Sequence, residues 1–232
     1  WPFGAVEQHG PHLPLATDSI FIEEIISEVL QLMPEDIPLK KIPTQYIGFS
    51  PEHSGFQGTI TLSSGLLTSM IVEIGKQISN IGFKRLILLN AHGGQISLLN
   101  TAARELRSIT PNLNVFPCFL WSGVKGLDKV LTKSELENGL HASLAETSLM
   151  MSLKPQLVGE ERPCEGIPKN TPNGWSLEGD APTAWFTEDI SESGVIGDSR
   201  GANLELGNKL KKLLIDHWYE LIIGLMSSDW PS

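Results

Sequence analysis

The chain has 232 residues, of which 41% are hydrophobic, and its formal net charge is −10 at pH 7. This length can bury a substantial core, and we expect one domain spanning residues 1–232. The negative charge and the scattered lysines and arginines argue against a nucleic-acid or anionic-membrane partner. No stretch approaches eighteen consecutive apolar residues, and Cys118 and Cys164 form no metal or redox motif. We therefore expect a cytoplasmic protein.

The spacing of apolar residues predicts strands that alternate with helices. In chain order it predicts a strand end over 1–6, a helix over 19–33, an extended segment over 39–47, a short strand before 63, a helix over 64–81, a strand over 84–90, a helix over 96–109, a strand over 114–121, and helices over 141–153 and 201–226. Residues 155–200 are rich in glycine, proline and acidic residues, and are long enough for a lid or an oligomer contact. The alternation predicts a three-layer α/β domain.

Residues 1–18 (WPFGAVEQHGPHLPLATD) combine carboxylates with imidazoles in a predicted loop. Glu7 and His9 are separated by one residue, so on an extended backbone they project to the same side. Asp18 stands at the predicted start of a helix. Imidazole and carboxylate ligands without thiolate suit zinc, manganese, iron or cobalt, so the segment predicts a metal site. The alternative is a polar loop whose histidines bond to backbone groups. His12 is better explained as a residue that orients a ligand.

His92 follows the predicted strand 84–90 and precedes Gly93 and Gly94. In open α/β sheets, chemistry gathers at the carboxyl ends of the strands, and glycine lets the backbone approach an ion or substrate closely. The alternative is a histidine that is hydrogen-bonded in a turn. A phosphate-binding loop is disfavoured, because the Walker lysine and the GxGxxG spacing are both absent.

Glu146 lies five residues after His141 on a predicted buried helix. A carboxylate among apolar residues is costly unless it is paired, protonated or bound to a metal, although a surface position is an alternative. Five nitrogen or oxygen ligands would then hold two divalent ions if one carboxylate bridges: Glu7, His9, Asp18, His92 and Glu146. Such a site polarises a carbonyl and lowers the pKa of a shared water, which implies hydrolysis. His141, if it stays unligated, is the best candidate to protonate a leaving nitrogen.

Four segments, EQHGPHLPLATD, SPEHSGFQGT, NAHGGQ and HASLAETS, together resemble the creatininase (creatinine amidohydrolase) family over most of the chain. The resemblance implies a three-layer α/β/α sandwich with a mostly parallel central sheet, a binuclear metal site, amidohydrolase activity and a homohexamer. By this resemblance Glu7, Asp18 and His92 correspond to ligands of one metal. Asp18 bridges to a second metal, which His9 also holds, and His141 corresponds to the proton-shuttling histidine.

The chain departs from the family where creatininases have the motif HYEN. Here Gly93 and Gly94 replace the tyrosine and the glutamate. We therefore expect Glu146 to act as the substitute ligand, and we do not expect creatinine itself as substrate. The HGG form resembles relatives that hydrolyse formamides, trim a peptide or open other small cyclic compounds.

From these observations we expect a metal-dependent amidohydrolase that cleaves a non-peptide amide, a cyclic amide or a formamide, through a metal-bridged hydroxide. His141 and Glu146 would be catalytic, and the cofactors would be two divalent ions per chain, zinc first, with manganese or iron as alternatives. Other interpretations are a non-catalytic metal-binding protein, a relative that trims a peptide bond, and a structural oligomer. His53 would approach the pocket from a loop, and His217 would lie at the surface or an interface. Three tryptophans would wall a flat substrate or pack in the core: Trp121, Trp175 and Trp185.

Overall fold

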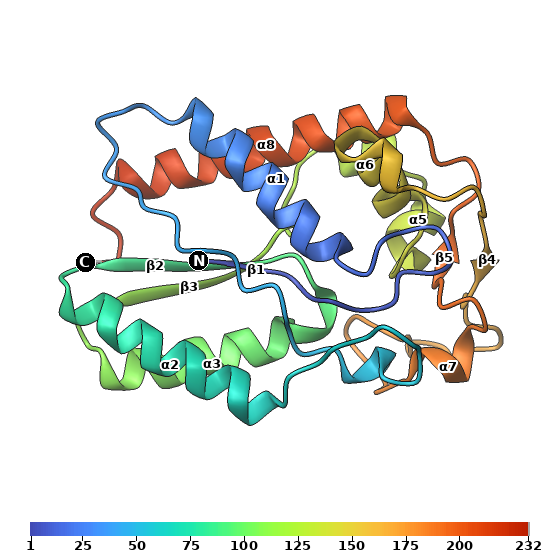
Figure 1. Cartoon of the computed structure of the whole chain (residues 1–232), viewed down its shortest axis with the longest axis horizontal. Coiled ribbons are helices and arrows are strands. Elements are labelled where there is room, and N and C mark those ends of the chain that lie inside the picture. The colour runs from blue at the N-terminus through green and yellow to red at the C-terminus, as the bar shows by residue number, and fades with distance from the viewer. Residues whose placement is uncertain (232) are drawn as a thin grey trace.

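The computed structural model describes residues 1–231 and has a parallel three-stranded sheet at its centre. The sheet has the order β1 (Pro2–Phe3), β2 (Arg85–Asn90) and β3 (Asn114–Phe119). Helices α1 (Thr17–Leu32) and α8 (Leu204–Met226) cover one face, and α2 (Ser64–Asn80) and α3 (Ile96–Ile109) cover the other (Figure 1). The predicted three-layer α/β/α architecture with a parallel sheet is confirmed.

Strand β2 lies in the middle of the sheet because its side chains are apolar on both faces. Leu86 and Leu88 pack into the core beneath α2 and α3, whereas Ile87 and Leu89 pack into the core beneath α1 and α8. A strand with two apolar faces is stable only when both are covered, which is the arrangement that parallel sheets require. The run of aliphatic residues thus fixes the position of the loop that follows β2.

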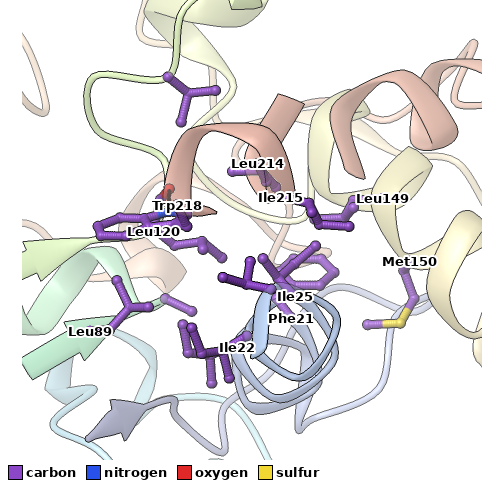
Figure 2. Close-up of a cluster of buried hydrophobic side chains, with 14 of the residues drawn as sticks. Phe21, Ile22, Ile25, Leu89, Leu120, Leu149, Met150, Leu214, Ile215 and Trp218 are labelled. Carbon is purple, nitrogen blue, oxygen red and sulfur yellow. Dashed lines mark hydrogen bonds between the residues drawn. The ribbon is translucent and has the colours of Figure 1, made fainter. Parts of the chain in front are cut away.

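The core between the sheet and helices α1 and α8 is drawn in Figure 2. Phe21 and Ile25 of α1 are fully buried there, together with Leu149. Trp218 of α8 fits into the same cluster, since its indole nitrogen donates a 2.8 Å hydrogen bond to the main-chain oxygen of Leu120. Each large apolar side chain contributes about 1.5–3 kcal/mol when fully buried, so this cluster fixes α1 firmly against the sheet.

The remaining elements are short and gather at one end of the molecule (Figure 1). They are the helices α4 (Leu127–Val130), α5 (Lys133–Asn138), α6 (Leu144–Leu153) and α7 (Thr187–Ile190), the 3-10 helices η1 (Pro51–His53), η2 (Gly93–Gln95) and η3 (Pro155–Leu157), and the antiparallel pair β4 (Cys164–Glu165) and β5 (Gly197–Asp198). The segment predicted to be extended over 39–47 contributes a single bridge, from Gln45 to Phe3, and the strand predicted before 63 contributes one from Ile60 to Val6.

The predicted helix over 141–153 is wrong at its start, because α6 begins at Leu144. His141 instead pairs through its backbone with Ile196, donating at 3.0 Å and accepting at 2.9 Å. Ala142 then turns the chain with a φ of 51°, and Ser143 is extended before the first helical residue. Backbone pairing with a distant segment therefore overrides the local apolar pattern. His141 and Glu146 do not share a helix.

The loops after β1 and β2 emerge at the same carboxyl edge of the sheet, because the two strands are parallel and adjacent. The register places Phe3 beside Asn90, so the chain leaves both strands at the same level. This edge carries the polar residues described next. Among the residues that the structure describes, no helix is both long enough and apolar enough to span a membrane.

Candidate metal centre

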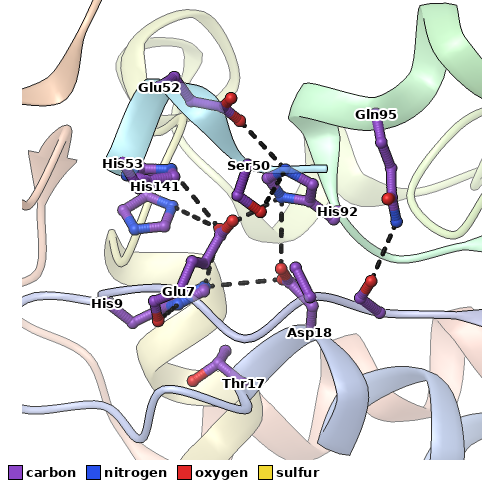
Figure 3. Close-up of polar contacts among 12 residues, drawn as sticks. Glu7, His9, Thr17, Asp18, Ser50, Glu52, His53, His92, Gln95 and His141 are labelled. Carbon is purple, nitrogen blue, oxygen red and sulfur yellow. Dashed lines mark hydrogen bonds and ion pairs between the residues drawn. The ribbon is translucent and has the colours of Figure 1, made fainter. Parts of the chain in front are cut away.

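Four of the predicted ligands meet at the carboxyl edge of the sheet. Glu7 and His9 lie on the loop after β1, Asp18 lies in the first turn of α1, and His92 follows β2. All four are buried, with at most 3% of each residue exposed. The alternation of Glu7 and His9 brings both side chains to the same side of the loop, where they face Asp18 (Figure 3).

Asp18 lies between the two imidazoles of this group. Its Oδ1 is 3.6 Å from His9 Nε2, and its Oδ2 is 3.4 Å from His92 Nδ1. Glu7 Oε1 approaches the same nitrogens, at 3.2 Å from His92 Nδ1 and 3.9 Å from His9 Nε2. Asp18 therefore has one oxygen directed toward each histidine, which is the arrangement a bridging carboxylate needs.

Several of these buried atoms have no hydrogen-bond partner within residues 1–231. They are both carboxylate oxygens of Glu7, Oδ2 of Asp18 and Nε2 of His9. Leaving a buried polar group unpaired costs about 1–3 kcal/mol, and more if it is charged. The unpaired atoms converge on one another and belong to hard or borderline ligands, so the donor set fits a first-row divalent cation.

Burial and mutual charge shift the pKa values in this cluster. Burial raises the pKa of Glu7 above its ordinary value. Burial acts to lower the pKa of His9, but the carboxylates of Asp18, Glu7 and Glu146 together outweigh it and raise that pKa to about 9. Burial likewise opposes ionisation of Asp18, yet His9 and His92 hold its pKa below the usual range. A cation that binds here must displace protons from the imidazoles.

Glu146, the proposed substitute ligand, lies in the first turn of α6 with His9 and His141 nearby. One ligand atom from each of these three residues lies within 4.8 Å of the others. Its Oε2 accepts a 2.6 Å hydrogen bond from the backbone N–H of Ala142, the residue before the helix N-cap. Burial raises the pKa of Glu146 to about 7. The structure thus brings Glu146 to the cluster, on the His9 side.

His141 also lies in the cluster, with a defined tautomer. Its Nε2 donates a 2.7 Å hydrogen bond to the main-chain oxygen of Gln8, since a carbonyl oxygen only accepts. Nδ1 is then the unprotonated nitrogen, and it lies 3.7 Å from Glu7 Oε1. Burial lowers the pKa of His141 well below its ordinary value. His141 therefore directs a free lone pair toward the carboxylates.

Sequence reasoning assigned no role to Glu52 and left His53 as a loop residue near the pocket. The structure places both at the centre, on η1 (Figure 3). His53 Nε2 lies 3.5 Å from Glu7 Oε1, and the His53 ring lies against that of His141 with centroids 4.1 Å apart and the planes tilted by 30°. Glu52 Oε1 lies 3.0 Å from His92 Nε2. The signal in the sequence for these two residues is the polar SPEH segment. No local pattern, however, indicates that this segment lies beside Glu7 in the fold.

The tautomer of His53 follows from the side-chain amide of Gln8. Gln8 Oε1 accepts from the Gly10 backbone at 2.9 Å, and Nε2 donates to the Gly194 oxygen at 3.0 Å, so the amide has one orientation. The second hydrogen of Nε2 points at His53 Nδ1, 2.8 Å away. His53 Nδ1 is therefore an acceptor, to which the hydroxyl of Thr187, with Oγ1 2.8 Å away, can also donate, and His53 Nε2 carries the proton toward Glu7.

The other aromatic and imidazole candidates differ in how close they lie to the ligand cluster. Trp185 stands edge-on to His53 with centroids 6.3 Å apart, whereas Trp121 packs against Phe21 and Trp175 is 60% exposed. Of the two alternatives for Trp121, core packing is confirmed, because its ring lies against Phe21 and the apolar core. Two histidines remain outside the cluster: His12, which bonds Thr147 Oγ1 at 2.8 Å, and His217, which packs against Trp218.

Known proteins of two kinds are similar in sequence to this chain. The mycofactocin precursor peptide peptidase of Mycobacterium tuberculosis (strain ATCC 25618 / H37Rv) is 31% identical over 229 residues, covering 93% of this chain and 80% of that protein. Creatinine amidohydrolase of Pseudomonas putida is 29% identical over 187 residues, covering 74% of this chain and 70% of that protein.

Solved structures share the fold. A structure from Bacteroides fragilis NCTC 9343 has a TM-score of 0.82 at 22% identity and covers 100% of this chain and 90% of that one. A mutant creatininase of the Zn-Zn type has a TM-score of 0.76 at 22% identity, covering 98% and 90%. The family model described as "Creatininase: Creatinine amidohydrolase" matches residues 1–222. Because that match includes both ligand loops, the resemblance is confirmed, and this chain belongs to the creatininase family.

Proposed function

We propose that this chain is a metal-dependent amidohydrolase that cleaves an amide bond in a peptide. The observation that carries the hydrolase assignment is the set of buried, unpaired ligand atoms on Glu7, His9 and Asp18. The peptide substrate is supported by the Mycobacterium tuberculosis relative, whose name describes a precursor-peptide peptidase. This changes the expectation from the sequence, which placed a non-peptide amide first and gave peptide trimming as one of the alternatives.

The residues divide into two adjacent ligand groups. Glu7, Asp18 and His92 would hold one ion, and His9, Asp18 and Glu146 would hold the other. Two divalent ions supply a polarised substrate carbonyl and an activated water when they are bound. Zinc is supported by the Zn-Zn type of one creatininase of similar fold, and manganese by another that is named with Mn.

His141 is suited to move the proton in this reaction. Its Nδ1 carries a free lone pair, because Nε2 is committed to the Gln8 oxygen. Nδ1 would take a proton from the attacking water and pass it to the leaving nitrogen as the C–N bond breaks. General acid–base catalysis of this kind contributes about 10²–10⁴-fold in rate.

His53 is suited to a different task, because it presents an N–H group where His141 presents a lone pair. Burial lowers the pKa of His53, so the ring is neutral and keeps its single proton on Nε2. That N–H would donate a hydrogen bond to the substrate oxygen as negative charge develops on it. A fixed donor of this type is worth about 10²–10³-fold in rate.

Elemental analysis combined with a substrate panel tests the proposal. Purified protein is analysed by plasma mass spectrometry, then assayed before chelation, after chelation and after metal is restored. The panel contains peptides with free C-terminal residues, creatinine, formamides and lactams. We expect about two divalent ions per chain and metal-dependent cleavage of a peptide.

Three results would contradict parts of the proposal. Metal-dependent turnover of a formamide or lactam alone would restore the small-molecule amide as substrate, which the Pseudomonas putida relative favours. Bound metal without cleavage of any substrate in the panel would favour a non-catalytic metal-binding protein. If the protein binds no metal and chelation has no effect on it, the assignment of a metal centre is wrong.

A further inference from the structure

Gly94 stands where the creatininase motif has a glutamate, and another carboxylate fills the space beside it. A Cβ atom added at Gly94 would lie 1.7 Å from Glu52 Oε1 and 2.6 Å from His92 Nε2. Neither contact is sterically allowed, so any side chain at position 94 would displace Glu52 or His92. The neighbouring Gly93 is different, because its added Cβ would meet nothing within 4 Å. The close approach of Glu52 and His92 to the backbone therefore requires glycine at position 94. Position 93 has no such requirement.

Glu52 reaches His92 from a segment that is remote in the sequence. Its Oε1 lies 3.0 Å from His92 Nε2. Thr187 Oγ1 lies 2.9 Å from the main-chain oxygen of Glu52 and 2.8 Å from His53 Nδ1, so the hydroxyl holds η1 in place. The main-chain oxygen of Phe49 and Ser50 Oγ lie 3.1 Å and 3.3 Å from the same nitrogen. Because a carboxylate and a carbonyl oxygen only accept, His92 Nε2 is the nitrogen that carries the proton.

The opposite nitrogen of His92 faces the ligand group. Nδ1 lies 3.2 Å from Glu7 Oε1 and 3.4 Å from Asp18 Oδ2. We propose that Glu52 is a positioning residue, which acts with the Phe49 carbonyl to hold His92 so that Nδ1 faces the ligand group, and which makes that nitrogen more basic. Gly94 provides the space that this carboxylate needs. The proposal rests on the metal centre described under Proposed function.

A hydrogen-bonded carboxylate behind a ligating histidine makes the histidine a stronger ligand. The carboxylate fixes the ring and increases the basicity of the opposite nitrogen, and its removal typically weakens metal affinity or activity by about 10–100-fold. The chain thus lacks the family's carboxylate at position 94 but has a carboxylate on η1 that acts on the same histidine.

Direct ligation by Glu52 is the competing interpretation, since Glu7, Glu52 and His92 each offer an atom within 4.8 Å of the others. The geometry favours positioning for two reasons. Glu52 contacts Nε2, whereas Glu7 and Asp18 contact Nδ1. In addition, the Glu52 side chain is 13% exposed, whereas those of Glu7 and Asp18 are at most 3% exposed.

The test uses metal binding and not activity alone. Zinc stoichiometry at saturation and the zinc dissociation constant, from chelator competition, are measured for the unmodified protein and for Glu52→Ala, Glu52→Gln and Gly94→Ala. Two matched controls accompany them. Gly93→Ala adds a methyl group in open space beside the site, and Glu188→Gln removes an exposed charge from α7, the helix that lies beside η1.

We expect Glu52→Ala and Gly94→Ala to keep the full zinc stoichiometry at saturation while weakening affinity by about 10–100-fold. Glu52→Gln retains an acceptor oxygen and should lose less zinc affinity than Glu52→Ala. Both control variants should bind zinc as tightly as the unmodified protein. Nuclear magnetic resonance of the zinc form gives a second readout. The His92 Nε2 proton should resonate downfield in the unmodified protein and move upfield in Glu52→Gln, which a loss of fold stability alone would not produce.

Two outcomes would overturn the proposal. Loss of one zinc per chain at saturation in Glu52→Gln would make Glu52 a ligand, and unchanged affinity in both Glu52→Ala and Gly94→Ala would leave it without a role. Failure of the metal centre is a separate result, because it would be seen in the unmodified protein as the absence of bound zinc.

Discussion

The side-chain nitrogen of Gln8 donates a 2.8 Å hydrogen bond to Nδ1 of His53. The main-chain oxygen of the same residue accepts a 2.7 Å hydrogen bond from Nε2 of His141. One residue of the EQHG segment therefore gives two adjacent imidazoles opposite tautomers. His141 presents a lone pair to the ligand group, and His53 presents an N–H.

Gln8→Glu should change the tautomer of His53 and leave that of His141 unchanged. A carboxylate accepts from His53 Nδ1, so the proton moves away from Nε2, while the main-chain bond to His141 remains. We expect kcat to fall by roughly 10²-fold, the value of one fixed donor, with metal content unchanged. Steady-state kinetics and plasma mass spectrometry measure the two effects. Unchanged kcat would show that the His53 N–H takes no part in the reaction.

Asp18→Asn should abolish both metal retention and turnover. Asp18 has one oxygen near His9 and the other near His92, so a neutral amide would weaken both ligand groups at once. Metal content after dialysis is the measurement, with Asp216→Asn on the exposed side of α8 as a control. Full metal occupancy with retained activity would contradict the bridging role.

His141→Ala should keep the metal ions and lose rate. We expect turnover to fall by about 10²–10⁴-fold, as for the loss of a general acid–base group. The metal content should match that of the unmodified protein, because His141 is assigned to proton transfer. If His141→Ala also empties a metal site, then Nδ1 is a ligand and the assignment is wrong.

Metal affinity should increase as the pH rises toward 9. The pKa of His9 in the metal-free protein is about 9, because the carboxylates of Asp18, Glu7 and Glu146 together outweigh the effect of burial. Below that pH the proton competes with the cation, so affinity should fall as the pH decreases through 9. The expected slope is about tenfold per pH unit for each proton released. Chelator competition between pH 6 and 9 tests this, and a flat profile would contradict the shifted pKa.

Two glycines of α8 should respond to alanine in opposite ways. A Cβ added at Gly207 would lie 1.9 Å from the main-chain oxygen of Ser148 in α6, whereas one at Gly224 would meet nothing within 4 Å. Gly224→Ala should raise the free energy of unfolding by about 0.5–1 kcal/mol. Gly207→Ala should lower it by about 1–3 kcal/mol, since α6 and α8 must separate. Urea unfolding measures both, and a stabilised Gly207→Ala would contradict this packing.

The sequence located the ligand loops correctly because their signals are local. The aliphatic run ending at Asn90 predicted a buried strand, and His92 lies directly after it in the structure. The one-residue spacing of Glu7 and His9 predicted that they face the same way, and both face Asp18. The helix assigned to His141 failed, because its backbone pairs with Ile196, which no local pattern reveals.

By itself, the sequence determined the three-layer fold, the loops that carry the ligands and the membership of the creatininase family, because apolar periodicity and motif spacing are properties of neighbouring residues. Only the tertiary structure decided that η1 delivers Glu52 and His53 to the site, which imidazole nitrogen faces the carboxylates, and why position 94 is glycine. These features depend on contacts between segments far apart in the chain, and such contacts exist only after the sheet and its helices have packed.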